Sequence, residues 1–318
     1  MQCGLFSQVI LSGPILFFLL GILAKVIRSD LNISDEITKF LSLYVLSAIG
    51  IKGGYELARA TFTPMSLVFL LIGILGSVFV TGLGYLIFSR LLSKANAAAF
   101  AATYGSISAM TFVTGASVLD RLGISYGPYM IACMALMEAP AIIFAVYIFS
   151  RNSRGRRESF FSTVHHAMTN QSVVLLLGSF IVGSLISPHA WSQIEPFYGK
   201  IFYGMLGLFL LDLGLVSAQT FSDLAKAPKR LFPLVILFSF CCALIAAVTV
   251  KVIGGGPGDT FLMMLLFGSG SYIAVPAAMR TAIPKADIGL YLPMSLGVTF
   301  PINIFFGIPL YLWIAQII

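Results

Sequence analysis

Charged side chains are scarce in this sequence. Aspartate, glutamate, lysine and arginine make up 10% of its 318 residues, whereas hydrophobic residues make up 58%. A soluble domain has roughly 25% charged residues. A chain this apolar cannot cover itself with groups that water solvates, which excludes an ordinary soluble domain. The mean hydropathy of +0.98 agrees, and the sequence therefore predicts a protein whose main partner is the lipid bilayer.

Signatures of several enzyme and metal-binding classes are also absent. The sequence has no Walker A motif, no His-Glu-x-x-His and no Gly-x-Ser-x-Gly, which excludes the chemistry that those motifs support. The four cysteines are not spaced as zinc ligands. We expect no enzyme activity and no cofactor. The formal charge of +7 does not indicate nucleic-acid binding, because the basic residues are scattered in short loops between apolar runs.

Long apolar runs dominate what is present. A helix needs about 20 mostly apolar residues to cross a bilayer, and ten stretches qualify. Because the first eight residues have no basic group, we interpret the first stretch as a span and not as a cleaved signal. The longest polar break, 151–170, divides the chain into halves 1–150 and 171–318 with five spans each. The expected spans are 9–27, 37–57, 65–89, 96–118, 127–150, 171–187, 197–221, 231–252, 258–280 and 288–315.

Basic residues are unevenly divided between the two sides of this arrangement. Fourteen of the 19 lysines and arginines lie in the odd-numbered loops, including four arginines in the 151–170 break. Cytoplasmic loops are enriched in basic residues. We therefore expect the 151–170 linker in the cytoplasm, both termini outside, and a multi-pass protein of the inner (plasma) membrane.

Short motifs recur between the two halves at a nearly constant offset of 161 to 163 residues. Each match alone is weak, but three in the same order predict an internal repeat. Since each half has an odd number of spans, the second half would be inverted, as in many secondary transporters. The matched segments are Tyr104–Ser108 with Phe267–Ser271, Ala139–Pro140 with Phe300–Pro301, and Gly21–Leu23 with Gly183–Leu185.

The repeated Gly-Ser-x-Ser lies near the middle of the fourth and ninth spans. Glycine and paired hydroxyls weaken a helix, and a break there exposes a helix N-terminus that favours an anion. The sequence predicts that both spans are broken and cross at mid-membrane. Ser106 and Ser108 would then face Ser269 and Ser271 around a small anion. The alternative is that these small residues only let helices pack closely.

Glu138 is the one carboxylate near the centre of a span, two residues before Pro140. Ionisable groups at this depth usually face an interior path. Glu138 could therefore ligate a sodium ion or carry a proton, with Thr111 and Thr114 as further candidate cation ligands. The alternative is a protonated glutamate with a structural role. Lys52 and Asp212 occupy similar places in the two halves, either as an ion pair or as separate side chains reaching opposite interfaces.

These residues together resemble a known family, the sodium-dependent bicarbonate transporters. The resemblance runs over nearly the whole chain. Its segments are Ala48–Leu57, Tyr104–Ser108, Met137–Pro140, Leu210–Asp212, Phe267–Arg280 and Leu290–Tyr311.

The resemblance implies a substrate site between the two broken helices and an elevator-like movement of a core against a scaffold. It also implies a homotrimer, sodium as the coupling ion and a PII-like cytoplasmic regulator. The chain departs from the family in having Ala109-Met110 between Ser108 and Thr111, Glu138 in place of an aspartate, and Tyr272 in place of another. The implied substrate-binding residues are Tyr104, Gly105, Ser106, Ser108, Phe267, Gly268, Ser269 and Ser271.

The sequence thus predicts a secondary active transporter of a small anion, with bicarbonate and sodium as the favoured pair. Two alternatives stay open at this point. One is an uncoupled anion channel, or a transporter of another small anion such as a carboxylate, on the same scaffold. The other is a membrane-embedded enzyme with Glu138 as general base. That reading would need a second polar group such as a histidine inside a span, and none lies there.

Overall fold

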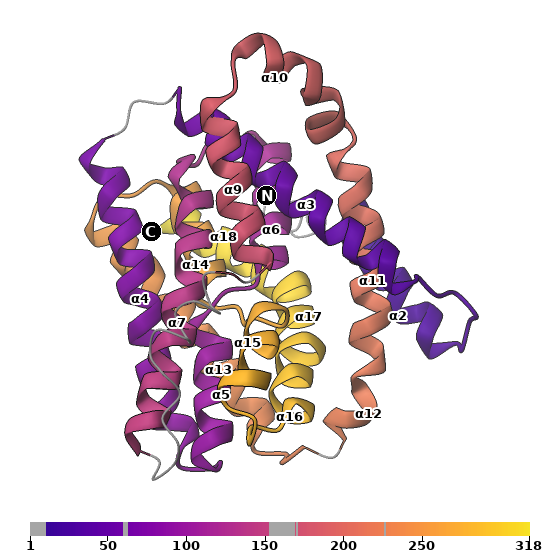
Figure 1. The fold of residues 1–318 in the computed structure, drawn as a ribbon, viewed down its shortest axis with the longest axis vertical. Coiled ribbons are helices and arrows are strands. Elements are labelled where there is room, and N and C mark those ends of the chain that lie inside the picture. Colours follow the sequence, from indigo (N-terminus) through magenta and orange to yellow (C-terminus); the bar gives the residue numbers. More distant parts are fainter. Residues whose placement is uncertain (1–10, 60–62, 153–168, 170, 226) are drawn as a thin grey trace.

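The computed structural model describes residues 11–59, 63–152, 169, 171–225 and 227–318, so the 151–170 linker lies almost entirely outside the described residues. Every regular element within these ranges is a helix (Figure 1). Apolar chains fold this way because a helix satisfies its backbone hydrogen bonds internally. The elements are α2 (Gly13–Val26), α3 (Asp35–Leu57), α4 (Pro64–Phe88), α5 (Lys94–Gly105), α6 (Ala109–Leu122), α7 (Tyr129–Asn152), α9 (Gln171–Leu185), α10 (Pro188–Glu195), η1 (Pro196–Lys200), α11 (Phe202–Gln219), α12 (Phe221–Leu224), α13 (Leu231–Val252), α14 (Pro257–Phe267), α15 (Ala274–Ala282), α16 (Ile288–Pro293), η2 (Met294–Thr299), α17 (Phe300–Ile302), η3 (Asn303–Gly307) and α18 (Ile308–Ile317).

Six helical stretches among the described residues are long and apolar enough to cross a membrane. Three further apolar helices, Gly13–Val26, Val174–Leu185 and Pro257–Phe267, are shorter than the about 20 residues that a full span needs. The all-helical membrane class is therefore confirmed, whereas the count of ten spans stays a prediction. The six stretches are Pro64–Phe88, Lys94–Leu122, Tyr129–Arg151, Pro188–Gln219, Leu231–Val252 and Ile288–Ile317.

Two of the expected spans are interrupted, as the sequence predicts. The fourth is divided into α5 and α6 by the non-helical residues 106–108, and the ninth into α14 and α15 by residues 268–273. The last span is distorted in another way. It contains the π-helical segments η2 and η3, and Pro293 and Pro301 lie at or near their starts. Proline removes a backbone donor, which favours such irregular turns.

Four helices form an outer group: α2 packs against α11, and α3 packs against both α9 and α11. Glycines allow these backbones to touch. A Cβ atom at Gly21 would collide with the carbonyl oxygen of Leu211, and one at Gly54 would collide with that of Phe180. Small residues have this role at many membrane helix interfaces.

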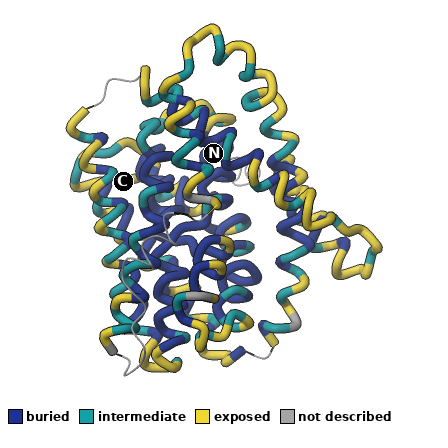
Figure 2. Tube along the Cα trace, in the orientation of Figure 1, coloured by how far each residue is buried: buried dark blue, intermediate teal, exposed yellow. Residues whose placement is uncertain are grey.

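The remaining helices form a central group built around the interrupted pair. Most residues of α5, the middle of α6 from Met110 to Leu119, and all of α14 after its first proline are buried, and Figure 2 shows this as a dark-blue interior. Helices that are apolar on all sides are buried on all sides. Here α4 and α7 cover α5, while α13 and α18 cover α14. The two interruptions therefore lie inside the protein.

Candidate functional site

The first interruption is stabilised by its own serines. Ser108 is the N-cap of α6, and its Oγ accepts hydrogen bonds from the backbone N–H of Thr111 at 3.2 Å and from the Thr111 hydroxyl at 2.8 Å. Serine is a preferred N-cap because its short side chain reaches a helix N–H that lacks an intrahelical partner. The motif thus ends one helix and begins the next within three residues.

The second interruption is longer and takes its support from the last span. The hydroxyl of Ser295 donates to the carbonyl oxygen of Gly270 at 2.7 Å, and Nδ2 of Asn303 donates to that of Gly268 at 2.8 Å. Ser271 Oγ also accepts from the backbone N–H of Val275, in the first turn of α15, at 3.3 Å. Buried backbone groups freed by a break need such partners. The sequence analysis missed Ser295 and Asn303, because their spacing from the motif has no local signal.

The two interruptions contact each other directly. The backbone N–H of Ser108 donates to Oγ of Ser269 at 3.0 Å, and the backbone N–H of Ser271 donates to the carbonyl oxygen of Thr103 at 2.8 Å. All four residues are buried. The predicted meeting of the two serine motifs is therefore present in the fold.

A glycine in each motif lets a neighbouring helix approach the break. Gly105 lies against Thr81 of α4, and a Cβ there would collide with the threonine side chain. Gly268 lies against α13, where a Cβ would be 3.0 Å from Ala243 and 3.2 Å from the carbonyl oxygen of Ser239. Both glycines shape the break and do not line the cavity beside it.

That cavity has a volume of about 20 Å³ and is lined by residues from both interruptions and from α7. Ser108, Ser271 and Glu138 are its predicted members, and they are nearly fully buried. A cavity of about 10–15 Å³ holds one water molecule, so this one has room for a single water or a small cation. The other lining residues are Leu46, Ile107, Ala109, Met110, Tyr272 and Ile273.

Glu138 lies on α7 and is 5% exposed. Within the described residues it has no hydrogen bond or ion pair, and it faces the cavity beside two serines. Its helix is held to α4, because Ser77 donates a hydrogen bond of 2.8 Å to the carbonyl oxygen of Met137. A carboxylate with hydroxyl oxygens nearby offers the oxygen ligands that hard cations prefer.

The cavity also borders the beginning of α6. Ala109 and Met110 line it and are the first two residues of that helix. The first N–H groups of a helix have no partner within the helix, and the helix dipole adds partial positive charge there. The start of α6 is therefore suited to an anion, and Glu138 in the same lining is suited to a cation or a proton.

The other predicted site residues do not line this cavity. Tyr104 forms a hydrogen bond of 2.8 Å between its hydroxyl and that of Thr299, and Phe267 packs over Gly76. Thr114 donates to the carbonyl oxygen of Met110 at 2.7 Å, and so binds its own helix. Ser106 is buried at the break, and its hydroxyl has no partner in the described part of the chain.

Tyr272 lines the cavity but was not predicted from the residue pattern. It follows Ser271, and its ring stands edge-on to Phe300 at 5.3 Å.

Lys52 and Asp212 do not pair with each other. Lys52 forms an ion pair of 2.7 Å with Asp120, while Asp212 is buried in the outer group. An ion pair between Lys52 and Asp212 is therefore wrong, while the alternative that the two side chains reach opposite interfaces stays a prediction.

Two interrupted helices that meet inside an apolar, all-helical protein are a feature of membrane transport proteins, and this arrangement places the chain in that class. Comparison with known families is more specific. A model of the Na⁺-dependent bicarbonate transporter superfamily matches residues 13–316, and the chain belongs to that superfamily. A search of curated proteins found no match. The family resemblance seen in the sequence is thus confirmed.

Proposed function

We propose that this protein is a secondary active transporter that moves a small anion, most favourably bicarbonate, together with sodium. The anion binds between the two interruptions, at the N-terminus of α6 and the hydroxyls of Ser108 and Ser271. Glu138 ligates the sodium ion. Membership of the Na⁺-dependent bicarbonate transporter superfamily supports the pair of substrates, and the geometry of the central cavity supports the residues.

A single observation supports the site most strongly. Ser108, Ser271 and Glu138 come from the first interruption, the second interruption and α7, and all three line one cavity. A lone buried carboxylate is costly in a membrane interior, and a cation beside it would offset that cost. The cavity of about 20 Å³ holds no bicarbonate as it stands. Anion binding therefore requires α3, which contributes Leu46 to the wall, to separate from the interruptions.

The same inference includes an architecture of two inverted five-helix repeats. Equivalent contacts recur at the repeat offset: Gly105 packs on Thr81, and Gly268 packs beside Ala243, 162 residues after Thr81. The outer group repeats in the same way, with α2 on α11 and α3 on α9. Such pairing is what a pseudo-two-fold axis between halves 1–150 and 171–318 produces.

The outer and central groups then correspond to a scaffold and a moving core. Transport would be an elevator-like displacement of the core, in a homotrimer of the inner membrane with both termini outside and the linker in the cytoplasm. A PII-like regulator would bind on that cytoplasmic side. Membership of the family and the distribution of basic residues support these features of the proposal.

The decisive experiment is uptake into proteoliposomes. Labelled bicarbonate and a panel of small carboxylates are offered with an inward sodium gradient, with equal sodium on both sides, and with potassium in place of sodium. We expect saturable uptake of bicarbonate only with the sodium gradient.

Two variants connect the uptake to the site. Glu138→Gln should need a higher sodium concentration for the same uptake, whereas Glu36→Gln, a carboxylate-to-carboxamide exchange at an exposed residue at the start of α3, should behave as the parent. Non-saturable uptake that does not depend on the sodium gradient would establish an uncoupled channel instead. Uptake of a carboxylate in place of bicarbonate would reassign the anion.

A further inference from the structure

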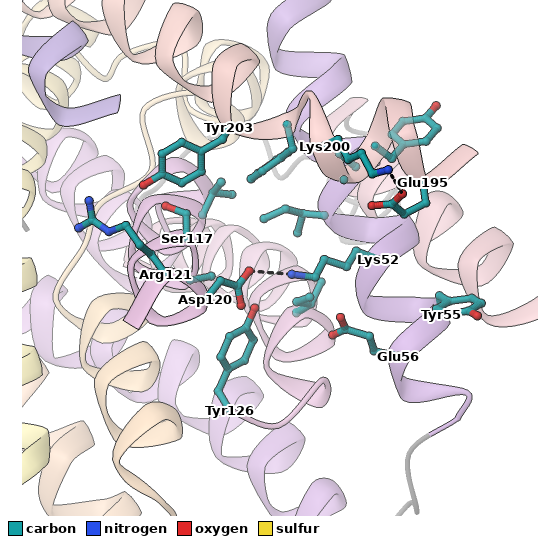
Figure 3. A pocket seen from close by; sticks show the side chains of 18 of the residues that line it. Lys52, Tyr55, Glu56, Ser117, Asp120, Arg121, Tyr126, Glu195, Lys200 and Tyr203 are labelled. Atoms are coloured by element: carbon teal, nitrogen blue, oxygen red, sulfur yellow. Dashed lines mark hydrogen bonds and ion pairs between the residues drawn. The ribbon is translucent and has the colours of Figure 1, made fainter. Parts of the chain in front are cut away.

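A second, much larger cavity of about 650 Å³ lies away from the interruptions (Figure 3). It separates the outer group from the central group. On one side are α3 and the run from α10 to α11, and on the other side are α6 and the loop that follows it. Sites for drug-sized ligands usually have about 300–1,000 Å³. The cavity is thus large enough for a small organic molecule.

Its walls are mostly apolar or aromatic. Ala48, Ile49, Val113 and Ala116 line its inner part, and Phe202 lies on the α11 side. Burial of apolar ligand surface against such walls is favourable in proportion to the area removed from water. The walls therefore favour a ligand with an apolar body of several rings or a branched hydrocarbon.

One ion pair crosses the cavity. Lys52 of α3 and Asp120 of α6 are joined at 2.7 Å, and both side chains are partly exposed. Figure 3 shows this pair spanning from one helix to the other, with the guanidinium of Arg121 directed away from it. On the far side, Lys200 lies 3.9 Å from Glu195. Within each of these two pairs, the positive and the negative charge neutralise each other.

Glu56 remains. It lies one turn after Lys52 on α3 and lines the cavity, and within the described residues it has no hydrogen bond or ion pair. Figure 3 shows its carboxylate beside Lys52. Tyr126 adds no charge, because burial and then the carboxylates of Asp120 and Glu56 raise the pKa of its hydroxyl far above neutrality. The carboxylates of Asp120 and Glu56 thus lie near the one ammonium group of Lys52, so negative charge is in excess at this point, although the charged side chains of the whole lining balance.

The rim already shows a cation on an aromatic ring. The guanidinium of Arg59 lies 3.6 Å from the centre of the Tyr55 ring, and that ring stacks on Trp191 at 4.5 Å. Both aromatic residues line the cavity. Aromatic faces attract cations, and organic ammonium groups are typical ligands of such surroundings.

We propose that this cavity is a binding site for an amphipathic organic cation, whose charged group lies near Glu56 and whose apolar body fills the space between α3 and α6. A ligand in this place contacts both helix groups and holds them at a fixed separation. If transport requires the groups to move past each other, the ligand inhibits it. That consequence rests on the proposed transport function, whereas binding itself does not.

Binding is tested on the purified, detergent-solubilised protein with two probes of the same size and shape but opposite charge, tetraphenylphosphonium and tetraphenylborate. Equilibrium dialysis should show one saturable phosphonium site per chain. Glu56→Gln should weaken it about tenfold, because the ion pairing across a partly buried site is lost. Ala116→Phe should also weaken it, because the ring occupies part of the space between α3 and α6. Glu36→Gln on the same helix is the control and should bind as the parent does.

Three results would overturn the proposal: no saturable site, equal affinity for tetraphenylborate, or phosphonium affinity unchanged in Glu56→Gln. If Ala116→Phe fails to fold, judged from its melting curve, the glutamine variant still decides the question. The probe pair removes simple micelle partitioning as an explanation, because the anion partitions as well as the cation does.

The transport consequence is tested separately in proteoliposomes. Tetraphenylphosphonium should inhibit anion uptake by the parent but not by Glu56→Gln. This permeant ion changes the membrane potential of both kinds of vesicle equally, so the glutamine variant is also the control for that effect. Equal inhibition of both proteins would overturn inhibition through the cavity. If no anion is transported at all while the binding results hold, the proposed function fails and the cavity site stands.

Discussion

The carboxylate of Asp259 accepts a hydrogen bond of 2.7 Å from the backbone N–H of Gly127, which ties the start of α14 to the loop between α6 and α7. A matching contact exists in the other half. Asn96, near the start of α5, accepts from the backbone N–H of Asp287 at 2.8 Å, just before α16. Each interrupted helix is thus fastened by its first turn to the loop that follows the other one.

Removing the Asp259 carboxylate should destabilise the protein. It also accepts a hydrogen bond of 2.8 Å from the Tyr129 hydroxyl, so Asp259→Ala leaves two donors without partners. An unpaired buried polar group costs about 1–3 kcal/mol, and we expect a clearly lower melting temperature in detergent. Asp30→Ala, at an exposed aspartate, is the control, and equal melting temperatures for both variants would contradict a structural role for this contact.

Glu138→Gln should weaken cation coupling more than it weakens folding. Glutamine keeps the volume of the side chain but not its charge. The packing around residue 138 is therefore kept, while a bound cation loses its strongest ligand. We expect a melting temperature near that of the parent and a half-saturating sodium concentration raised about tenfold or more, which corresponds to 1.4 kcal/mol. Uptake with unchanged sodium and pH dependence would make Glu138 a structural residue.

Added bulk at the meeting point of the interruptions should block transport. Ser269→Leu removes the oxygen that accepts from the Ser108 N–H and fills space beside the cavity, and Ser106→Leu adds bulk at the other break. We expect both variants to purify as the native oligomer and to lose anion uptake in proteoliposomes. Ser47→Leu, a serine on α3 whose hydroxyl binds its own helix, serves as control. Normal uptake by either break variant would contradict the proposed site.

Gly21→Ala should separate α2 from α11. The new methyl group would collide with the backbone carbonyl of Leu211, which cannot move without shifting α11. Overpacking of this kind costs about 1–3 kcal/mol, measurable as a lower melting temperature. Gly204→Ala on α11 is matched to it, because a Cβ there meets open space. A Gly21→Ala protein as stable as the Gly204→Ala protein would show that the two helices separate easily.

The predicted orientation is open to a labelling test. Single cysteines are introduced at Gln193 and at Lys285, both exposed, in a variant whose native cysteines are replaced. Because basic residues gather on the side of Lys285, a membrane-impermeant maleimide should label the Gln193→Cys protein on intact cells. The Lys285→Cys protein should react only after permeabilisation. The reverse pattern would invert the topology.

The sequence alone determined the class of the protein and the location of its helix breaks. Ten percent charged residues cannot cover a soluble fold, so the membrane conclusion needed no coordinates. The interruptions at residues 106–108 and 268–273 were predictable because capping by serine and weakening by glycine act within a few residues along the chain. Repetition of the motif at a constant offset also indicated that the two breaks are related.

Only the tertiary structure decided which side chains meet. Lys52 pairs with Asp120 and not with Asp212, and Glu138 joins Ser108 and Ser271 at one cavity, whereas Thr114 binds its own helix. These outcomes depend on how helices distant in sequence are rotated and offset when they pack. Membrane helices pack through many small contacts between similar apolar and small residues, so the residues along any one helix leave its rotation undetermined until its neighbours are in place.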